Sequence, residues 1–382
     1  MSRLPAIAAN ASPGALATPA VQGLAPYLPG KPVDELEREL GIRNIIKLAS
    51  NENPFGASPK AIAAARDSLA SCGTYPDGSG HHLKQKLAAL HGVSAPQITL
   101  GNGSNDVLVL LAEAFLAPGL EAVYSQYAFA VYPIAVQATG ATCRSVAALQ
   151  SPQPMALGHD LVAMQAAISA QTRLVFVANP NNPTGTYVEP AELLQFVRAV
   201  PRHALVVLDE AYFEYSRSIP LQNGIEWLAD CPNLVIVRTF AKAYGLAGLR
   251  IGYAVSHPAV ADMLNRIRQP FNVSSVALAA AAAALDDPQH VERTVAVATS
   301  ERGRLSAVLR ERGFWVAPSA GNFLLLHIGS QAAAVYQRLL HAGIIVRPVA
   351  NYGLGEYLRV SLGTIADNER FLAALPGAMQ HA

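Results

Sequence analysis

The pattern that most constrains the fold is an alternation, between residues 54 and 255, of short apolar runs with amphipathic helical stretches. The apolar runs contain few polar residues, which is typical of strands covered on both faces. They span Glu121–Ser125, Thr172–Ala178, Ala204–Asp209, Leu234–Thr239 and Ile251–Val255. The alternation predicts an α/β fold in which crossover helices connect the strands of a mostly parallel sheet. A sheet of this kind binds its ligands at the carboxyl ends of its strands.

The pattern changes after about Arg266, where longer helical stretches alternate with three more strand-like runs. The helical stretches are Ala277–Leu285, His290–Arg312 and Ala332–His341, and the runs are Asn322–Ile328, Ile344–Pro348 and Tyr357–Leu362. This part predicts a smaller α+β domain, on which residues 36–48, helical and then extended, are expected to pack. We therefore expect an N-terminal arm with part of the small domain at residues 1–50, a large domain at 51–270 and the small domain at 271–382.

Composition and charge exclude several classes of protein. Apolar residues make up 51% of the 382 residues and charged residues only 14%, so the chain can bury a large core. The formal charge is +1 and no basic run is present, which argues against a nucleic-acid partner. The longest apolar run, residues 276–285, is much shorter than the roughly 20 residues of a membrane-spanning helix. We therefore expect neither nucleic acid nor membrane as a partner.

The cysteines and the N-terminus bear on where the protein works. Cys72, Cys143 and Cys231 are odd in number, far apart and without CxxC spacing. They predict a reducing, cytoplasmic environment and neither a disulfide framework nor a metal site. Pro13 and Pro19 interrupt any continuous apolar core in residues 1–20, so this segment is interpreted as an N-terminal arm rather than a signal peptide.

Lys242 is the most informative single residue. The chain has six lysines and 22 arginines, and from position 87 onward Lys242 is the only lysine beside 18 arginines. An amine among guanidinium groups suggests Schiff-base chemistry, which requires a group that can lose its proton; chance in an arginine-rich chain is the other interpretation. Thr239 and Arg250 flank Lys242 and are candidates to hold an anion beside the amine.

Further candidates lie where other strands end. Asp209 ends an apolar run and Tyr212 follows it, although a helix cap or an ion pair of residues 209–210 is an alternative role for the carboxylate. Asn182 lies between two prolines in the turn 179–185, which suggests a positioned donor or an ordinary turn. Phe129, near the end of another strand, is a candidate shelf for a cofactor or simply a core aromatic, as is Tyr132.

Two groups are suited to anions. The glycine-rich residues 101–106 open a helix predicted over Val107–Leu116, where Ser104 and Asn105 offer a phosphate cradle or a simple helix cap. Asp106 replaces the third glycine of a GxGxxG motif, which disfavours a nicotinamide-dependent dehydrogenase. Arg347 and Arg359 interrupt apolar runs and each requires an anionic partner, either a ligand or a buried carboxylate.

Together these features resemble a known family. The resemblance runs from about Tyr27 to the C-terminus and rests on residues 48–56 (LASNENPFG), 75–78 (YPDG), 180–185 (PNNPTG), 209–212 (DEAY) and 242–250. These motifs resemble pyridoxal-phosphate enzymes of the aspartate-aminotransferase fold (fold type I), and in particular the histidinol-phosphate aminotransferase branch. The resemblance implies transfer of an amino group from L-histidinol phosphate to 2-oxoglutarate in histidine biosynthesis. An aromatic amino-acid aminotransferase, a phosphothreonine decarboxylase and a non-catalytic regulator that binds pyridoxal phosphate or phosphate are the alternatives.

The resemblance also implies a role for each candidate. Lys242 carries the pyridoxal phosphate, Asp209 keeps its ring nitrogen protonated, and Tyr212 hydrogen-bonds the ring 3-oxygen. The remaining cofactor contacts are Asn182 at the same oxygen, Phe129 on the ring face, and Ser104, Asn105, Thr239 and Arg250 at the phosphate. Tyr27, Asn182, Arg347 and Arg359 are the implied substrate-binding residues. In the implied homodimer Tyr75 reaches the phosphate of the second subunit and Tyr27 its substrate anion. Ala241 departs from the pattern, because many relatives have a serine there.

Overall fold

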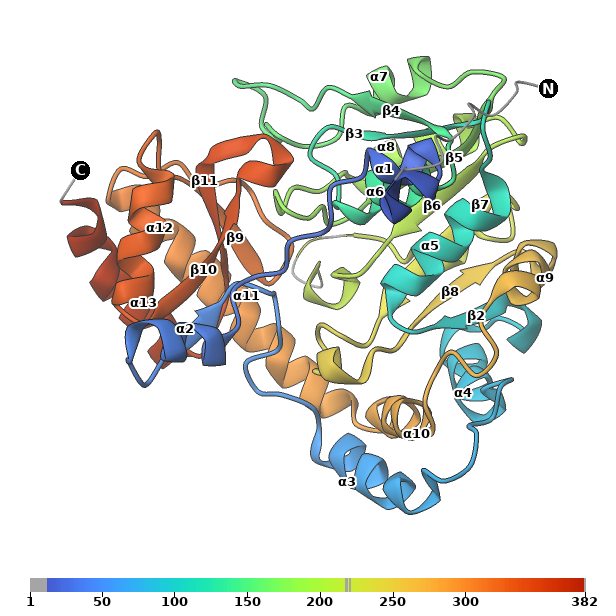
Figure 1. Cartoon of the computed structure of the whole chain (residues 1–382), viewed down its shortest axis with the longest axis horizontal. Helices are drawn as coiled ribbons and strands as arrows, with labels where there is room; N and C mark the ends of the chain where they lie inside the picture. Colours follow the sequence, from blue (N-terminus) through green and yellow to red (C-terminus); the bar gives the residue numbers. More distant parts are fainter. Residues whose placement is uncertain (1–11, 217–218, 220, 381–382) are drawn as a thin grey trace.

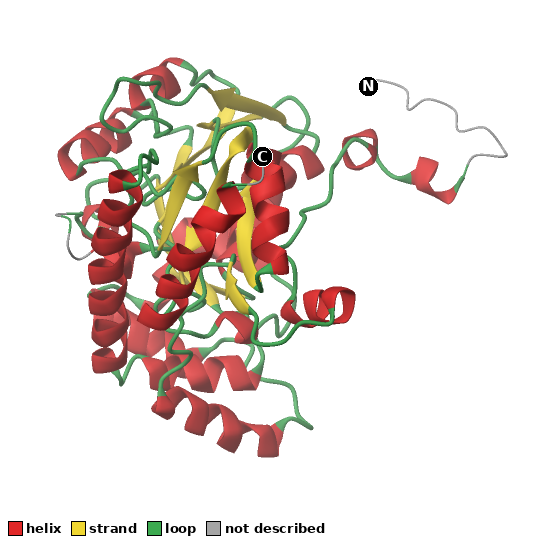
Figure 2. Ribbon diagram, turned by 90° about the vertical axis from the view of Figure 1, so that its left-hand side faces the viewer, coloured by secondary structure: helices red, strands yellow, loops and turns green. Residues whose placement is uncertain are grey.

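The computed structural model describes residues 12–216, 219 and 221–380 (Figure 1). Residues 1–11 of the predicted N-terminal arm lie outside the described residues. The next residues form a 3₁₀ turn at Pro13–Leu16 and the short helix α1 (Pro19–Gln22), which packs on α6 (Val131–Ala138). From α1 an extended segment runs across the molecule to α2 (Val33–Leu40), in blue in Figure 1. The first described residues are largely exposed and stand out from one side in Figure 2.

A seven-stranded sheet forms the larger part of the molecule. Its order is β2 (Ile98–Gly101), β8 (Gly252–Ser256), β7 (Leu234–Thr239), β6 (Leu205–Asp209), β5 (Thr172–Ala178), β3 (Glu121–Ser125) and β4 (Thr142–Val146). Strands β3 to β7 pair in parallel, as the sequence pattern predicted, whereas β8 is antiparallel to both neighbours. The reason is local: residues 240–251 connect β7 to β8 without a crossover helix, so the chain returns in the opposite direction.

Helices cover both faces of this sheet, as Figure 2 shows. They are α3 (Pro59–Ser68), α4 (His81–His91), α5 (Ser104–Phe115), α6, α7 (Leu161–Ala166), α8 (Pro190–Ala199), α9 (Pro258–Ile267) and α10 (Ser275–Ala284). Successive residues of β5 enter opposite cores: Leu174 and Phe176 pack with α5 and α6, and Val175 and Val177 pack on the other face. This two-sided burial explains why the strands contain so few polar residues.

A four-stranded sheet forms the smaller part, in the order β1 (Ile46–Leu48), β10 (Ile344–Val349), β11 (Leu354–Ser361) and β9 (Phe323–His327). Its helices are α2, α11 (Pro288–Glu311), α12 (Ala332–His341) and α13 (Ile365–Met379). The prediction that residues 36–48 pack on the C-terminal part is confirmed, because Ile46 of β1 pairs in parallel with Ile344 of β10. Among the residues with assigned structure, none of the helices combines the length and apolar character needed to cross a bilayer.

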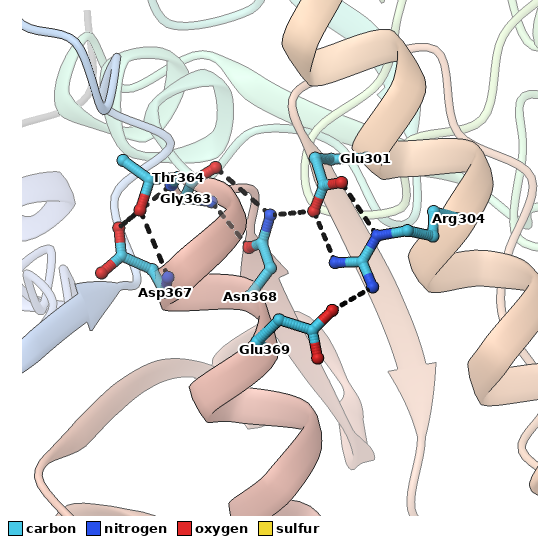
Figure 3. Close-up of polar contacts among 7 residues, drawn as sticks. All are labelled: Glu301, Arg304, Gly363, Thr364, Asp367, Asn368 and Glu369. Carbon is cyan, nitrogen blue, oxygen red and sulfur yellow. Dashed lines mark hydrogen bonds and ion pairs between the residues drawn. The ribbon is translucent and has the colours of Figure 1, made fainter.

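A polar network fixes the chain just after β11 (Figure 3). The buried amide of Asn368 donates to Glu301 Oε2 at 2.8 Å, and its Oδ1 accepts from the backbone N–H of Gly363 at 2.9 Å. Arg304 grips the same Glu301 with two hydrogen bonds of 2.8 and 2.7 Å, and Thr364 begins α13 with a capping box. The end of β11 is thus tied to the long helix α11.

Candidate active site

A cavity of about 450 Å³ lies at the carboxyl ends of β5, β6 and β7 and is also lined by residues of the small sheet. The predicted site residues that line it are Tyr27, Ser104, Asn105, Phe129, Asn182, Asp209, Tyr212, Thr239, Lys242, Arg250, Arg347 and Arg359. The fold thus brings together every predicted site residue except Tyr75.

Lys242 follows β7 in a loop that faces this cavity. Its Nζ donates to the carbonyl oxygen of Ser50 at 3.0 Å and lies 5.7 Å from the centre of the Tyr212 ring. Loss of hydration, and then the charges of Arg359 and Arg250, lower the pKa of Lys242 to about 8. About a tenth of the amine is therefore unprotonated at pH 7, far more than for an ordinary lysine, and this is the form that a nucleophile or base requires.

Asp209 ends β6 and is buried. Its Oδ2 accepts a hydrogen bond of 2.7 Å from the hydroxyl of Tyr132, and its Oδ1 accepts one of 3.1 Å from the backbone N–H of Ala211. Burial raises the pKa of Asp209 to about 6. The ion-pair alternative applies to the next residue instead, because Glu210 binds Arg238 at 2.6 Å.

Of the two interpretations of Tyr132, cofactor shelf or core aromatic, the structure supports the second, because Tyr132 is fully buried and is not among the residues that line the cavity. Its ring is fully buried and stacks on Phe176 with the centroids 4.7 Å apart, so it is a core aromatic. Its hydroxyl nevertheless supports Asp209, which the sequence does not indicate. Phe129 lines the cavity and meets the Tyr132 ring edge-on at 6.0 Å.

Tyr212 and Asn182 lie beside Asp209 in the cavity wall. The Tyr212 hydroxyl accepts a hydrogen bond of 2.9 Å from Asn51 Nδ2, and burial raises the pKa of Tyr212 to about 12, so the phenol is neutral at pH 7. Asn182 Oδ1 accepts from Arg359 Nη1. Asn51 was not among the predicted site residues. The only feature of the sequence that indicated it was its place in the motif at 48–56.

The first anion-binding group is built on the start of α5. A Cβ added to Gly103 would lie 2.4 Å from Arg250 Nη2, and one added to Gly252 would lie 2.3 Å from the backbone nitrogen of Ser104, so only glycine permits this close packing. The guanidinium of Arg250 therefore lies against the helix N-terminus. Thr239 is adjacent in the cavity wall, where its Oγ1 accepts from the backbone N–H of Ala241 at 3.1 Å. Free N–H groups, guanidinium and hydroxyl together suit a phosphate.

The second anion-binding group is a pair of arginines. Arg347 of β10 and Arg359 of β11 are directly opposite each other in the antiparallel register, with exposed fractions of only 7% and 6%. Arg347 donates to the Leu28 carbonyl oxygen and Arg359 to that of Ala49, and Arg359 Nε is buried without a partner. Among the described residues neither arginine forms an ion pair, so the alternative of a buried protein carboxylate is wrong there. Two buried cations side by side favour a dianion.

Two tyrosines, Tyr27 and Tyr75, were expected to contact the site of a second subunit. Tyr27 was expected to reach a second subunit, but the structure places its ring 5.8 Å from the guanidinium of Arg347 in the same chain. The reason is the path of the extended segment, which α1 and the hydrogen bond to Leu28 hold along the cavity. Tyr75 lies outside the cavity; it is 81% exposed and stacks on Phe271 at 4.7 Å.

Comparison with known proteins places the chain in a family. Residues 43–375 match the family model described as aminotransferase class I and II. The chain is 57% identical over 369 residues to histidinol-phosphate aminotransferase 2 of Pseudomonas aeruginosa, covering 96% of this chain and 98% of the relative. It is 55% identical over 370 residues to the Pseudomonas fluorescens protein of the same name, with the same coverage.

Solved structures agree. Histidinol-phosphate aminotransferase from Sinorhizobium meliloti, solved in complex with pyridoxal-5'-phosphate, superposes with a TM-score of 0.86 at 32% identity, covering 95% of this chain and 97% of that one. Aspartate aminotransferase from Thermus thermophilus with maleate shares the fold, with a TM-score of 0.80 at 23% identity over 95% and 98% of the two chains. By the family match over most of its length, and by these relatives, the chain belongs to the class I and II aminotransferases.

Proposed function

We propose that this enzyme is a pyridoxal-phosphate-dependent histidinol-phosphate aminotransferase. It transfers the amino group of L-histidinol phosphate to 2-oxoglutarate, forming imidazole acetol phosphate and L-glutamate in histidine biosynthesis. The observation that carries the substrate assignment is the buried pair Arg347 and Arg359, neither of which forms an ion pair with a residue that the structure describes. Lys242 lies within electrostatic reach of Arg359 of this pair and of Arg250, so the reactive amine has a cation of each anion-binding group near it.

The residues present fit pyridoxal phosphate. Its phosphate matches the donors at the start of α5, Arg250 and Thr239, where the glycines allow close approach. Its ring nitrogen matches the buried carboxylate of Asp209, and its 3-oxygen matches the neutral hydroxyl of Tyr212 and the amide of Asn182. A cavity of about 450 Å³ is within the range of roughly 300–1,000 Å³ usual for cofactor and substrate sites.

When bound, pyridoxal phosphate supplies an electron sink for the electrons left when substrate Cα loses its proton. The protein supplies the proton handling. Asp209 holds a proton on the ring nitrogen, and the Tyr132 hydroxyl favours the ionised carboxylate that this requires. Lys242 Nζ, with its pKa lowered to about 8, takes the proton from Cα of the amino donor. In the second half of the reaction it delivers a proton to Cα of the product formed from the oxo acid.

Substrate selection follows from the arginine pair. Histidinol phosphate has a phosphate ester where an amino acid has its α-carboxylate, so the same site must accept a dianion and a monoanion. Arg359 is the main anion clamp, because its Nη atoms are held by Asn182 Oδ1 and the Ala49 carbonyl oxygen. Arg347 adds the second charge and Tyr27 lies over it.

The decisive test compares kcat/KM for L-histidinol phosphate and L-phenylalanine with 2-oxoglutarate as acceptor. We expect a clear preference for histidinol phosphate. A preference for phenylalanine would overturn the substrate assignment in favour of an aromatic aminotransferase. Glutamate should bleach the visible band of the cofactor-loaded protein, and Lys242→Ala should abolish both bleaching and turnover. Cofactor binding without any response to glutamate would instead indicate a regulator.

The active unit that we propose is a homodimer in which Tyr75 contacts the cofactor phosphate of the partner. An exposed aromatic pair, Tyr75 on Phe271, supports this, because Tyr75 has no contact with the cavity of its own chain. Mixing a Lys242→Ala chain with a Tyr75→Ala chain tests it. Shared sites predict that each heterodimer contains one complete site and regains activity. Heterodimers as inactive as both parents would contradict the sharing.

The cysteines support a cytoplasmic location. Cys72 is exposed and Cys231 is buried, and neither forms a disulfide, nor does Cys143. Unpaired thiols, one of them on the surface, suit a reducing compartment. Fractionation of cells that express the protein tests this location.

A further inference from the structure

Three buried side chains connect the small sheet to the cavity. Ser361 is the last residue of β11, two positions after Arg359, and is 3% exposed. Its Oγ accepts from the backbone N–H of Asn51 at 2.8 Å and donates to Asn51 Oδ1 at 2.7 Å. The amide of Asn51, which is 1% exposed, then donates from Nδ2 to the Tyr212 hydroxyl oxygen at 2.9 Å.

The count of donors and acceptors selects one orientation of the Asn51 amide. Ser361 has a single hydroxyl proton, and Asn51 Oδ1 is its acceptor. Turning the amide by 180° would place its NH₂ group against Ser361 and leave the serine proton without an acceptor in a buried position. A buried donor without a partner is unfavourable, so Ser361 keeps Nδ2 directed toward Tyr212.

This orientation determines where the Tyr212 proton points. Because the phenol oxygen accepts from Asn51, its own proton is directed elsewhere, and Tyr212 lines the cavity. With the amide turned, Oδ1 would face Tyr212 and would accept that proton. Burial raises the pKa of Tyr212 to about 12, so the proton is present at neutral pH in either case.

The hydrogen-bonded chain Ser361–Asn51–Tyr212, called the relay below, is held in place by contacts with the small sheet. Asn51 has a left-handed backbone with φ of 56°, and its carbonyl oxygen accepts from Asn322 Nδ2 at 3.1 Å. The backbone carbonyl oxygen of Asn322 in turn accepts a hydrogen bond of 2.8 Å from the backbone N–H of Leu362. The next residue, Gly363, belongs to the network of Figure 3 that ends on α11. Ser361 therefore has little freedom to move away from Asn51.

We propose that Ser361, acting through Asn51, is a positioning residue that directs the Tyr212 proton to the 3-oxygen of bound pyridoxal phosphate. This inference rests on the proposed function, because the cofactor supplies the acceptor. It also links the strand that carries Arg359 to the chemistry at the ring. A proton donated to the 3-oxygen withdraws negative charge from it, so this oxygen stabilises a cationic lysine nitrogen beside it less well. Losing the donation should therefore raise the pKa of Lys242 in its cofactor-bound form.

The experiment is a pH titration of the visible absorption band of the cofactor-loaded protein. We expect Ser361→Ala to raise the titration midpoint by about one pH unit, the size expected for one hydrogen bond to a charged group. Ser361→Thr keeps the hydroxyl and should retain the parental midpoint. Tyr212→Phe should shift the midpoint in the same direction, and adding Ser361→Ala to it should cause no further shift.

The outcomes separate the relay from the proposed function. A parent protein without a visible band would refute the proposed function itself. A normal band with an unchanged midpoint in folded Ser361→Ala would overturn the relay, as would a further shift in the double variant. Should Ser361→Ala not fold, Ser361→Cys, with a weaker donor of similar size, takes its place and should shift the midpoint in the same direction. The other ionisable neighbours of Tyr212 are unchanged throughout; they include Arg359, Asp209, Lys242, Tyr132, Tyr215 and Tyr352.

Discussion

Replacing Tyr132 with phenylalanine removes the hydroxyl that donates to Asp209 Oδ2 and retains the ring that stacks on Phe176. A hydrogen bond to a charged group contributes about 1.5–3 kcal/mol, and one pKa unit corresponds to about 1.4 kcal/mol. The pKa of Asp209 in the cofactor-free protein is already raised to about 6 by burial. Without the hydroxyl it should rise by about one to two further units.

The effect on stability has a definite sign. The pKa of Asp209 in the folded protein lies above the unfolded value of about 3.9, so the folded state binds its proton more tightly. Stability therefore falls as pH rises from about 4 to the folded pKa and is constant above it. In Tyr132→Phe the fall continues to about pH 7–8, and the destabilisation relative to the parent should grow by about 1.5–3 kcal/mol between pH 5 and pH 8.5.

Urea unfolding of the cofactor-free proteins at these two pH values measures this difference. Tyr124→Phe is the matched control, because Tyr124 of β3 is also a buried tyrosine but has no hydrogen bond to Asp209. The loss of unfolding free energy caused by Tyr124→Phe should be the same at both pH values. If the loss of unfolding free energy caused by Tyr132→Phe is also independent of pH, the argument that the Tyr132 hydroxyl stabilises the ionised carboxylate is refuted.

Three further predictions concern the cavity. Arg359→Lys loses the planar fork, so KM for histidinol phosphate should rise at least about tenfold in steady-state assays, with a smaller change in kcat; an unchanged KM would show that Arg359 does not bind the substrate anion. Ala241→Ser adds a hydroxyl to the cavity wall, and spectroscopic titration should show the Kd for pyridoxal phosphate falling about three- to tenfold. An unchanged Kd would show that the side chain of residue 241 does not contact the cofactor phosphate. Because the pKa of Lys242 is lowered to about 8, stopped-flow capture of pyridoxal phosphate should accelerate about tenfold per pH unit below that value and level off above it. A flat profile would contradict the lowered pKa.

The strands that the sequence predicted best are those buried on both faces. β3, β5 and β7 have the predicted bounds, because uninterrupted apolar runs identify central strands. The edge strand β4 was not predicted, since its residues are polar and partly exposed and resemble a loop in composition. β2, only four residues long beside a glycine-rich turn, offered too short a pattern to recognise.

The same contrast applies to the cavity. Asp209 and Lys242 could be placed together from sequence, because strand ends of a parallel sheet meet at one edge. The partners that support them could not: Tyr132 is 77 residues from Asp209, and Asn51 is 161 residues from Tyr212. No local pattern records such pairings. Tyr27 lies on an extended segment without periodicity, so its direction depended on where that segment packs.

The pairing of β1 with β10 has a consequence for how the chain is made. Ile46 leaves the ribosome early, and its partner Ile344 is synthesised only after the whole seven-stranded sheet. At about 5–20 residues per second, β1 waits roughly 15–60 s for the strand that covers it. Throughout that interval its backbone edge and the apolar face of α2 are open to other chains. Nascent chains that stall before β10 should therefore be the species that chaperones capture, and the small sheet is the last part of the molecule to form.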